Sequence, residues 1–370
     1  MEKVIGLLNL HCDRDLGALT AKRSIASTSF LGRYAFLDFP LSNFANSDID
    51  VVGILVRDSL RSLIRHLGSG HSFMDNTKLG SITMLYDEPY AHNLGYNNDI
   101  NNLLENKWFL DNSSATTVVI APSSMICSID YRSYIEKHLQ SGSRISMIYA
   151  PNQDTKNHFI DCDLLSFDST GRVQSITRNR GNTEKGDVFL NMIIIEKEML
   201  NSLIQYASKT SSFFTLRDTL AYVCKEIKIF SIPCDNLVYY FDSLSSYLNQ
   251  SLDLLNPQNF NKLFVPHWPI YTKTYDTPPV IYGDKSEVKN SFIANGAHIE
   301  GKVINSIIGR DVYIKEGAEI RNSIIFSKGI VSENTFLDHV ICDKEAQILY
   351  SKKLVGKEDE PFFIRRENIV

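Results

Sequence analysis

Short apolar runs alternate with amphipathic segments through the first two thirds of the chain. Four nearly continuous apolar runs predict buried strands at residues 4–8, 51–56, 118–120 and 145–148. Between them, apolar residues recur three or four positions apart over 59–67 and 130–140, which predicts helices. Buried strands separated by helices are typical of an α/β fold with a mixed, mostly parallel sheet covered on both faces. Ligands bind such sheets at the carboxyl ends of the strands, so we expect the functional site in the loops after Leu8 and Ile120.

The last third of the chain has a different period. Five prolines between Asn256 and Pro279 interrupt any regular element, which predicts a linker at residues 256–280. Beyond it, aliphatic residues recur six apart, in the series Ile308, Ile314, Ile320; Val312, Ala318, Ile324; and Ile325, Val331, Leu337. This spacing is typical of a parallel β-helix, in which each six-residue face stacks on the next coil. An antiparallel β domain is the alternative, because its period of two also divides six.

These patterns predict three parts: an α/β domain at 1–255, the linker, and a β-helix with a C-terminal tail at 281–370. We expect the β-helix itself to end near residue 348, after fewer than four coils of 18 residues. The tail residues Phe362, Phe363, Arg365 and Arg366 are then expected to serve packing or an interface.

Composition narrows the class of protein. The chain has 38 Lys and Arg against 43 Asp and Glu, a net charge of −5, without a basic cluster, which argues against a nucleic-acid partner. Its six cysteines form no C-x-x-C pair, as expected for reduced thiols in the cytoplasm. The histidines show no metal-ligand spacing, and no apolar run approaches the roughly 18 residues of a membrane span.

Residues 32–43, GRYAFLDFPLSN, resemble the G-[KR]-Y-R-[IL]-[IL]-D-F-P-L-S-N stretch of ADP-glucose pyrophosphorylases, the glucose-1-phosphate adenylyltransferases. Residues 66–70 and 245–255 resemble further stretches of that family, and the resemblance extends from about residue 4 to residue 348. It implies a nucleotide-diphospho-sugar-transferase-type domain followed by a left-handed β-helix. It also implies a reaction in which glucose 1-phosphate attacks ATP and releases pyrophosphate, with Mg²⁺ held by two aspartates.

The departures from that family are concentrated at its reaction centre. Six positions that the resemblance assigns to phosphate, sugar-phosphate or metal binding carry other side chains: Asp13, Asp15, Ile25, Ser124, Asn179 and Tyr240. Asp13 and Asp15 replace a glycine and the arginine of the phosphate loop, where carboxylates repel a triphosphate. Ser124 and Tyr240 stand at the two metal aspartates, and neutral hydroxyls bind Mg²⁺ poorly without a carboxylate beside them. Removing one preorganised electrostatic group costs about 10²–10³ in rate, so we expect little or no activity from this chain alone.

This pattern resembles the non-catalytic, GlgD-type subunit that accompanies a catalytic ADP-glucose pyrophosphorylase subunit in some bacteria. The resemblance implies a regulatory, cytoplasmic subunit in glycogen biosynthesis, assembled with a catalytic subunit in a heterotetramer. We then expect this chain to bind no metal or cofactor, with Mg²⁺ held only in the catalytic partner.

Three basic residues are candidates for a sugar-phosphate effector site. Lys22 and Arg23 match a basic pair that serves such a site in some family members, and Arg33 is a further candidate cation. Two other readings remain open. One is an active adenylyltransferase that uses Asp13, Asp15 or Asp99 as replacement metal ligands. The other is a stand-alone sugar-phosphate sensor without a catalytic partner.

Overall fold

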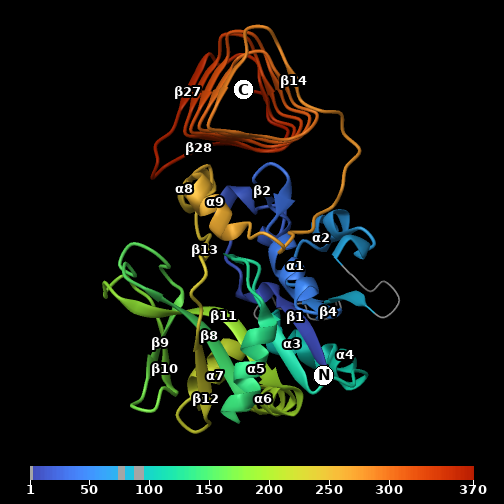
Figure 1. Ribbon diagram of the computed structural model, residues 1–370, viewed down its shortest axis with the longest axis vertical. Helices are drawn as coiled ribbons and strands as arrows, with labels where there is room; N and C mark the ends of the chain where they lie inside the picture. Colours follow the sequence, from blue (N-terminus) through green and yellow to red (C-terminus); the bar gives the residue numbers. More distant parts are fainter. Residues whose placement is uncertain (1–2, 74–79, 87–95) are drawn as a thin grey trace.

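An α/β domain and a triangular β-helix lie end to end along the long axis of the molecule (Figure 1). The computed structural model describes residues 3–73, 80–86 and 96–370. Both parts that the sequence patterns predict are present.

Within the described residues, one nine-stranded mixed sheet forms the centre of the α/β domain. Its strands are β1 (Val4–Asn9), β4 (Val51–Leu55), β5 (Ser81–Leu85), β6 (Thr117–Ala121), β8 (Ile145–Asn152), β9 (Asp163–Phe167), β10 (Val173–Arg178), β11 (Gly186–Glu196) and β12 (Ile229–Pro233). β1 pairs in parallel with β4 and β6, whereas β11 runs antiparallel to β6, β8 and β9. All four predicted strands are confirmed, and the antiparallel β11 accounts for the mixed character of the sheet.

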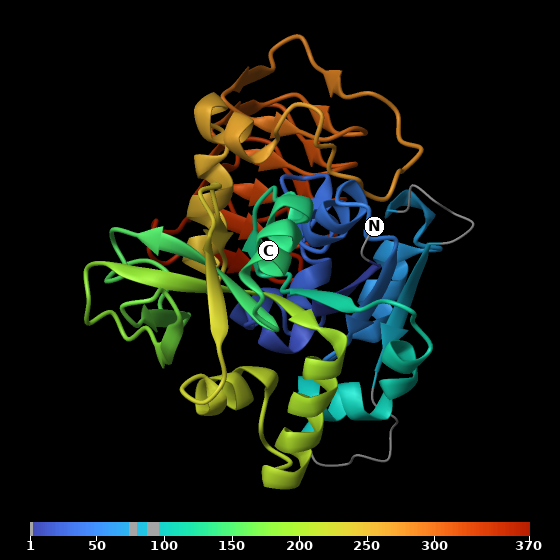
Figure 2. The ribbon, with the colours of Figure 1, turned by 60° about the horizontal axis from the view of Figure 1, so that its bottom comes forward.

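Helices cover both faces of this sheet (Figure 2). One face is covered by α1 (Asp38–Asn46), α2 (Leu60–Leu67) and α5 (Tyr131–Ser141), and the other by α3 (Asp99–Glu105), α4 (Lys107–Asp111), α6 (Lys197–Thr210) and α7 (Leu216–Val223). Alternation along β1 sends Leu7 to one core and Leu8 to the other. Gly6 lies on the same face of β1 as Leu8, where a Cβ would come within 3.2 Å of the Phe44 ring, so glycine permits the close approach of α1. The predicted helices at 59–67 and 130–140 are confirmed as α2 and α5.

Short elements connect the sheet to the β-helix. They comprise η1 (Leu10–Cys12), η2 (Gly17–Leu19), η3 (Ile25–Ser27), β2 (Ser29–Phe30), β3 (Tyr34–Ala35), η4 (His71–Phe73), β7 (Met125–Ile126), β13 (Tyr239–Tyr240), α8 (Leu244–Asp253) and α9 (Pro257–Leu263). Helix α9 corrects the expectation that the prolines of residues 256–280 exclude regular structure. Pro257 is the first residue of α9, where its missing N–H has no intrahelical acceptor in any case, and Asn256 caps the helix through the Gln258 N–H. Beyond α9, residues 264–280 form no helix or strand and run past α2 to the first strand of the β-helix (Figure 1).

Three five-stranded parallel sheets form the faces of a left-handed β-helix. The first is β14 (Ile281–Tyr282), β17 (His298–Ile299), β20 (Tyr313–Ile314), β23 (Ile330–Val331) and β26 (Gln347–Ile348). The second is β15 (Glu287–Lys289), β18 (Lys302–Ile304), β21 (Glu319–Arg321), β24 (Phe336–Asp338) and β27 (Lys353–Val355). The third is β16 (Phe292–Ile293), β19 (Ile307–Ile308), β22 (Ile324–Ile325), β25 (Val340–Cys342) and β28 (Phe362–Ile364). The parallel pairing throughout excludes the antiparallel alternative.

The coils are shorter than the expected 18 residues. Ile307 pairs with Ile324 and Ile324 with Ile341, so these strands lie 17 residues apart, whereas Phe292 and Ile307, at the start of the same face, lie 15 apart. One corner is shortened by an Asn-Ser step, at which Asn322 has φ 44° and the Ser323 N–H bonds to the Ser306 hydroxyl. Because this corner is shorter, the hexapeptide phase shifts there. After Ala318 and Ile320, the next aliphatic side chain inside the β-helix is Ile325, whereas the six-residue spacing predicts Ile324.

The C-terminal tail also corrects an expectation. Residues 353–355 and 362–364 are strands β27 and β28, which extend two faces of the β-helix beyond residue 348. Phe363 lies opposite Ile341 but 22 residues later, because a longer loop separates β27 from β28. That loop breaks the six-residue spacing and hides the last coil from the sequence pattern.

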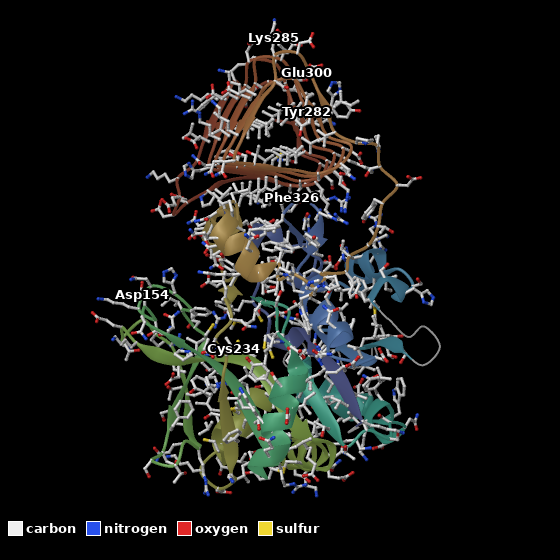
Figure 3. The ribbon with its side chains drawn as sticks, in the orientation of Figure 1. Asp154, Cys234, Tyr282, Lys285, Glu300 and Phe326 are labelled. Atoms are coloured by element: carbon white, nitrogen blue, oxygen red, sulfur yellow. The ribbon has the colours of Figure 1, made fainter. Side chains whose placement is uncertain are left out.

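The two parts meet through an apolar interface. Ile307, Ile324 and Ile341 point outward from the third face and pack in one cluster with Phe241 and Tyr247 of the α/β domain. Phe326 lies at the base of the β-helix, above α8, and its ring centroid is 6.0 Å from that of Tyr247 (Figure 3). Burial of these side chains on both sides favours a fixed placement of the β-helix on the α/β domain.

Candidate functional site

A cleft of about 420 Å³ opens where β1 and β6 end, at the edge of the sheet expected from the sequence. The loop after β1 forms one wall, and Asp163, Arg178 and Arg217 form part of the opposite wall. The loop after β1 lies at the carboxyl ends of the parallel strands, as ligand sites in such sheets do, whereas Asp163 and Arg178 belong to the antiparallel strands β9 and β10.

The loop after β1 is a short helical turn that carries a side chain at every position. The Asn9 side chain accepts the His11 N–H at 3.0 Å and starts η1, and Leu10 is buried beneath it. Burial and the positive charge of Arg57 lower the pKa of His11 to about 4. The imidazole is thus neutral at physiological pH and adds no cation to the cleft.

Asp13 closes the junction between the loops after β1 and β6. Its carboxylate accepts the N–H groups of Ser123 and Ser124, at 3.1 and 2.9 Å, and the Ser123 hydroxyl. Burial raises the pKa of Asp13 to about 6, although these hydrogen bonds act in the opposite direction. The backbone donors that the β6 loop could offer to an incoming anion are thus already bound to a carboxylate of the same chain.

Ser124 and Tyr240, the positions assigned to metal aspartates, lie close together. Strand β7 pairs with β13 so that Met125 lies opposite Tyr240, and Ser124 is almost fully buried. The Tyr240 ring stacks on Phe159 with centroids 6.0 Å apart, and burial raises the pKa of its phenol. In the described part of the chain, no group of three or more His, Cys, Asp or Glu side chains is arranged to hold a metal ion. These neutral side chains do not fit the Mg²⁺ that the family resemblance implies.

The three aspartates considered as replacement metal ligands do not converge. Asp15 is exposed and forms an ion pair with Arg57 at 3.1 Å. Asp99 is buried and accepts hydrogen bonds from Asn9 Nδ2 at 2.8 Å and the Leu216 N–H at 2.9 Å. Each carboxylate, Asp13 included, is satisfied by a different partner.

Two further predicted site residues serve packing. Asn179 is buried, donates its side-chain amide to the carbonyls of Thr155 and Phe159, and accepts the Gly181 N–H. It holds the loop after β8 and does not line the cleft. Ile25 is buried in the apolar cluster that faces the β-helix.

The cleft has no surplus of positive charge. Four arginines and five aspartates line it, and the arginines pair within the chain. Arg217 makes a two-pronged bond to Asp163 at 2.7 and 2.9 Å, and Arg14 pairs with Asp161 at 2.9 Å. A polyphosphate would therefore have to break existing ion pairs and approach aspartates of its own sign.

The structure separates the three basic residues predicted for an effector site. Lys22 is exposed, whereas Arg23 is buried and forms a 2.6 Å ion pair with Asp343 of the β-helix. Arg33 is exposed and lines two adjoining clefts, of about 310 and 300 Å³, between the α/β domain and the β-helix. Of the three, Arg33 is the one that lines these interdomain clefts.

The same interdomain clefts contain cations that the sequence analysis missed. Arg310, Lys328 and Lys344 of the β-helix line them together with Arg33. Burial and the neighbouring Arg33 lower the pKa of Arg310, and burial followed by the charge of Arg23 lowers the pKa of Lys344 to about 8. These cations follow one another at the same corner of successive coils, roughly one coil length apart, and this spacing is the signal that could have found them.

Comparisons with known proteins agree with this architecture. Residues 15–177 match the nucleotidyl transferase family, and residues 281–365 match the GlmU-like C-terminal hexapeptide family. Among the described helices, none combines the length and the apolar character needed to cross a bilayer.

Similar proteins are found among bacteria. The glycogen biosynthesis protein GlgD of Geobacillus stearothermophilus is 30% identical over 366 residues, which cover 96% of this chain and 93% of the relative. The GlgD protein of Bacillus subtilis is 27% identical over 94% of this chain and 91% of its own. A glucose-1-phosphate adenylyltransferase of Acetivibrio thermocellus is 26% identical over 90% of this chain and 79% of its own.

Proposed function

The chain belongs to the family of the GlgD glycogen biosynthesis proteins and the glucose-1-phosphate adenylyltransferases, and from this premise we propose that it is a regulatory subunit of a bacterial ADP-glucose pyrophosphorylase. In this proposal it has little or no activity alone, binds no Mg²⁺, and assembles in the cytoplasm with a catalytic subunit in a heterotetramer. The catalytic partner holds the Mg²⁺ and joins glucose 1-phosphate to ATP.

The Asp13 contact is the observation that carries the proposal. Its carboxylate occupies the N–H groups of Ser123 and Ser124 in the place where the family reaction requires an open, positively charged phosphate site. A triphosphate entering this cleft would face Asp13 and Asp15 while the nearby arginines stay paired. Electrostatic stabilisation of the transition state, the largest contribution to phosphoryl-transfer catalysis, has no source here.

The interdomain clefts support the regulatory part of the proposal. Arg33, Arg310 and Lys344 provide positive charge at the contact between the α/β domain and the β-helix. A sugar phosphate bound there would contact both parts of the chain, so its binding would favour one relative placement of the two. Arg23 then contributes indirectly, through its ion pair with Asp343, and exposed Lys22 receives the anionic effector or faces the catalytic subunit.

A turnover assay tests the catalytic part of the proposal. The purified chain is supplied with ATP, glucose 1-phosphate and Mg²⁺, and pyrophosphate release is compared with that of a catalytic adenylyltransferase from the same genome. We expect no release above background from this chain alone. Turnover comparable to that of the catalytic protein would contradict the proposal and favour an active enzyme with unusual ligands.

Co-expression tests the assembly. We expect the tagged chain to co-purify with the catalytic protein, and the complex to respond to a sugar phosphate differently from the catalytic protein alone. Failure to co-purify would overturn the regulatory-subunit proposal and favour a stand-alone sensor. A complex whose effector response equals that of the catalytic protein alone would contradict the regulatory role.

A further inference from the structure

A second, larger cleft of about 750 Å³ lies outside the loops that form the candidate site. Three segments that are far apart in the sequence form it: residues 152–159, residues 238–253 with β13 and α8, and Glu358 in the loop between β27 and β28. Asp154, labelled in Figure 3, belongs to the first of these segments, at the edge of the α/β domain. A volume of this size accommodates a ligand larger than one sugar ring.

The lining of this cleft excludes an anionic ligand. Its polar groups are amides and hydroxyls, from Asn152, Asn249, Gln250 and Ser245, and carboxylates such as Asp242. Among the described residues that line it, none is a lysine or an arginine. A phosphate group would find no lysine or arginine there and would face the carboxylates of Asp242, Asp253 and Glu358, in contrast to the interdomain clefts.

Two stacked aromatic rings form an apolar wall of the cleft. Phe159 and Tyr240 lie nearly parallel, with ring centroids 6.0 Å apart and an interplanar angle of 13°. The stack covers one face of each ring, and because Tyr240 is almost fully buried, the partly exposed Phe159 offers most of the ring surface to a ligand. The face of an aromatic ring carries a partial negative charge and attracts weakly positive C–H groups. A ligand with a C–H-rich face and hydroxyls around its edge complements this wall and the polar lining at once.

The wall is held in place before any ligand arrives. Phe159 has φ 55°, a left-handed conformation that is rare for a bulky residue, and the Asn179 amide donates to its carbonyl at 2.9 Å. Backbone strain of this kind is found at ligand sites more than elsewhere. Opposite, the Gln250 Nε2 donates to the Tyr240 carbonyl at 2.7 Å, while the Gln250 Oε1 is buried without a partner in the described part of the chain.

We propose that this cleft binds a neutral oligosaccharide, with a sugar ring against Phe159 and Tyr240 and its hydroxyls on the amides and carboxylates of the lining. The site is independent of the proposed regulatory role, because it requires neither a catalytic partner nor an anionic effector. It also explains why Tyr240 lies against Phe159, at a position where the reaction of the family needs a carboxylate.

Isothermal titration of the full chain with maltotetraose and with cellotetraose tests the proposal. We expect at least one tetrasaccharide to bind at millimolar concentration or below. Replacing Ser245 by Trp fills the cleft and leaves the Ser243–Ser246 capping box of α8 intact, so S245W should weaken that binding at least tenfold. The matched control is S133W, because Ser133 is an exposed serine in the first turn of α5 and lies away from the cleft. It should leave binding unchanged.

A second variant covers the case in which S245W does not fold, which a thermal melt detects. Tyr240→Phe keeps the ring and should retain binding within about threefold, whereas Tyr240→Ala removes the wall and should abolish it. No binding of either tetrasaccharide, or binding that S245W and Tyr240→Ala leave unchanged, overturns the proposal. Tighter binding of spermine or of glucose 1-phosphate, lost in the same variants, overturns the neutral class of ligand.

Discussion

The cleft of the α/β domain and the interdomain clefts contain similar charged residues and differ in how their charges are paired. In the cleft of the α/β domain, Arg14, Arg57 and Arg217 each form an ion pair with an aspartate of the same chain. In the interdomain clefts, Arg310 and Lys344 have lowered pKa values because burial disfavours their charged forms and other cations lie near them. The number of basic residues therefore says little about anion binding, and the partner of each residue decides it.

Under the proposed function, this difference separates a cleft that cannot stabilise a polyphosphate from clefts that can bind a sugar phosphate. A cleft whose cations are already neutralised has no electrostatic gain left for a polyphosphate. A cleft whose cations repel one another gains stability when an anion enters.

Arg23 lines none of these clefts. Its side chain is buried, and its charge is paired with that of Asp343. Replacing it with Ala leaves the Asp343 carboxylate buried without its cation, and we expect the free energy of unfolding to fall by about 3–5 kcal/mol. Equilibrium denaturant unfolding measures the change. Arg144→Ala, which breaks an exposed pair with Glu196, is the control and should cost less than about 1 kcal/mol. A stable R23A variant that loses only sugar-phosphate binding would show that Arg23 is a direct ligand.

Asp13 tests whether the cleft of the α/β domain is closed by a strained carboxylate. Burial raises its pKa from 3.8 to about 6, so the folded protein favours the protonated acid. The raised pKa of Asp13 adds about 3 kcal/mol to the free energy of unfolding below pH 4. This contribution is lost as the pH rises through 6. In Asp13→Asn this decrease in unfolding free energy between pH 4 and pH 7 should disappear, while exposed Asp15→Asn should keep it. An unchanged pH profile in D13N would contradict the raised pKa of the buried Asp13 carboxyl group.

Arg310 tests the unpaired side of the comparison. We expect Arg310→Ala to weaken binding of glucose 6-phosphate by about 10- to 100-fold, because it removes a charged hydrogen-bond donor. Calorimetry on the chain alone measures this affinity. Arg321→Ala, which removes an exposed arginine paired with Glu319 on β21, should change it less than about twofold. Equal losses in R310A and R321A would show that only the net charge of the surface matters.

Lys344 should make that binding depend on pH. Its pKa is lowered to about 8 by burial and by Arg23, so the amine loses its proton as the pH rises from 7 to 9. Because the protonated amine attracts an anion, affinity for glucose 6-phosphate should fall by up to about tenfold over this range. Lys344→Arg keeps its charge throughout and should flatten the profile. A wild-type affinity that is independent of pH would place Lys344 outside the site.

Much of the fold follows from local patterns in the sequence. The apolar runs at 51–56 and 118–120 predict strands because side chains in a sheet covered on both faces are buried on both sides. The hexapeptide spacing predicts the β-helix for a similar reason. The spacing does not predict the 17-residue coil, because one corner turns through an Asn-Ser step. Nor does it predict the last coil, which a longer loop interrupts.

The contacts between the residues of the candidate site could be predicted only in part from the sequence. The family resemblance assigns Asp13, Ser124 and Tyr240 to one region. The structure places Asp13 against Ser124 and pairs the strand of Tyr240 with the strand that follows Ser124. The sequence could not show that Asp13 binds the N–H groups of Ser123 and Ser124, because partners 110 residues apart leave no periodic signal. The pairing of Arg23 with Asp343 was hidden in the same way, across 320 residues.

A crystal structure of the chain grown with ATP and Mn²⁺ tests most directly whether the cleft of the α/β domain has lost its metal chemistry. Mn²⁺ replaces Mg²⁺ and is located by its anomalous scattering. We expect no metal ion between the nucleotide and the side chains of Ser124 and Tyr240, and Asp13 still bonded to the N–H groups of Ser123 and Ser124. A metal ion that bridges the α-phosphate to protein oxygens in this cleft would contradict the loss of catalysis.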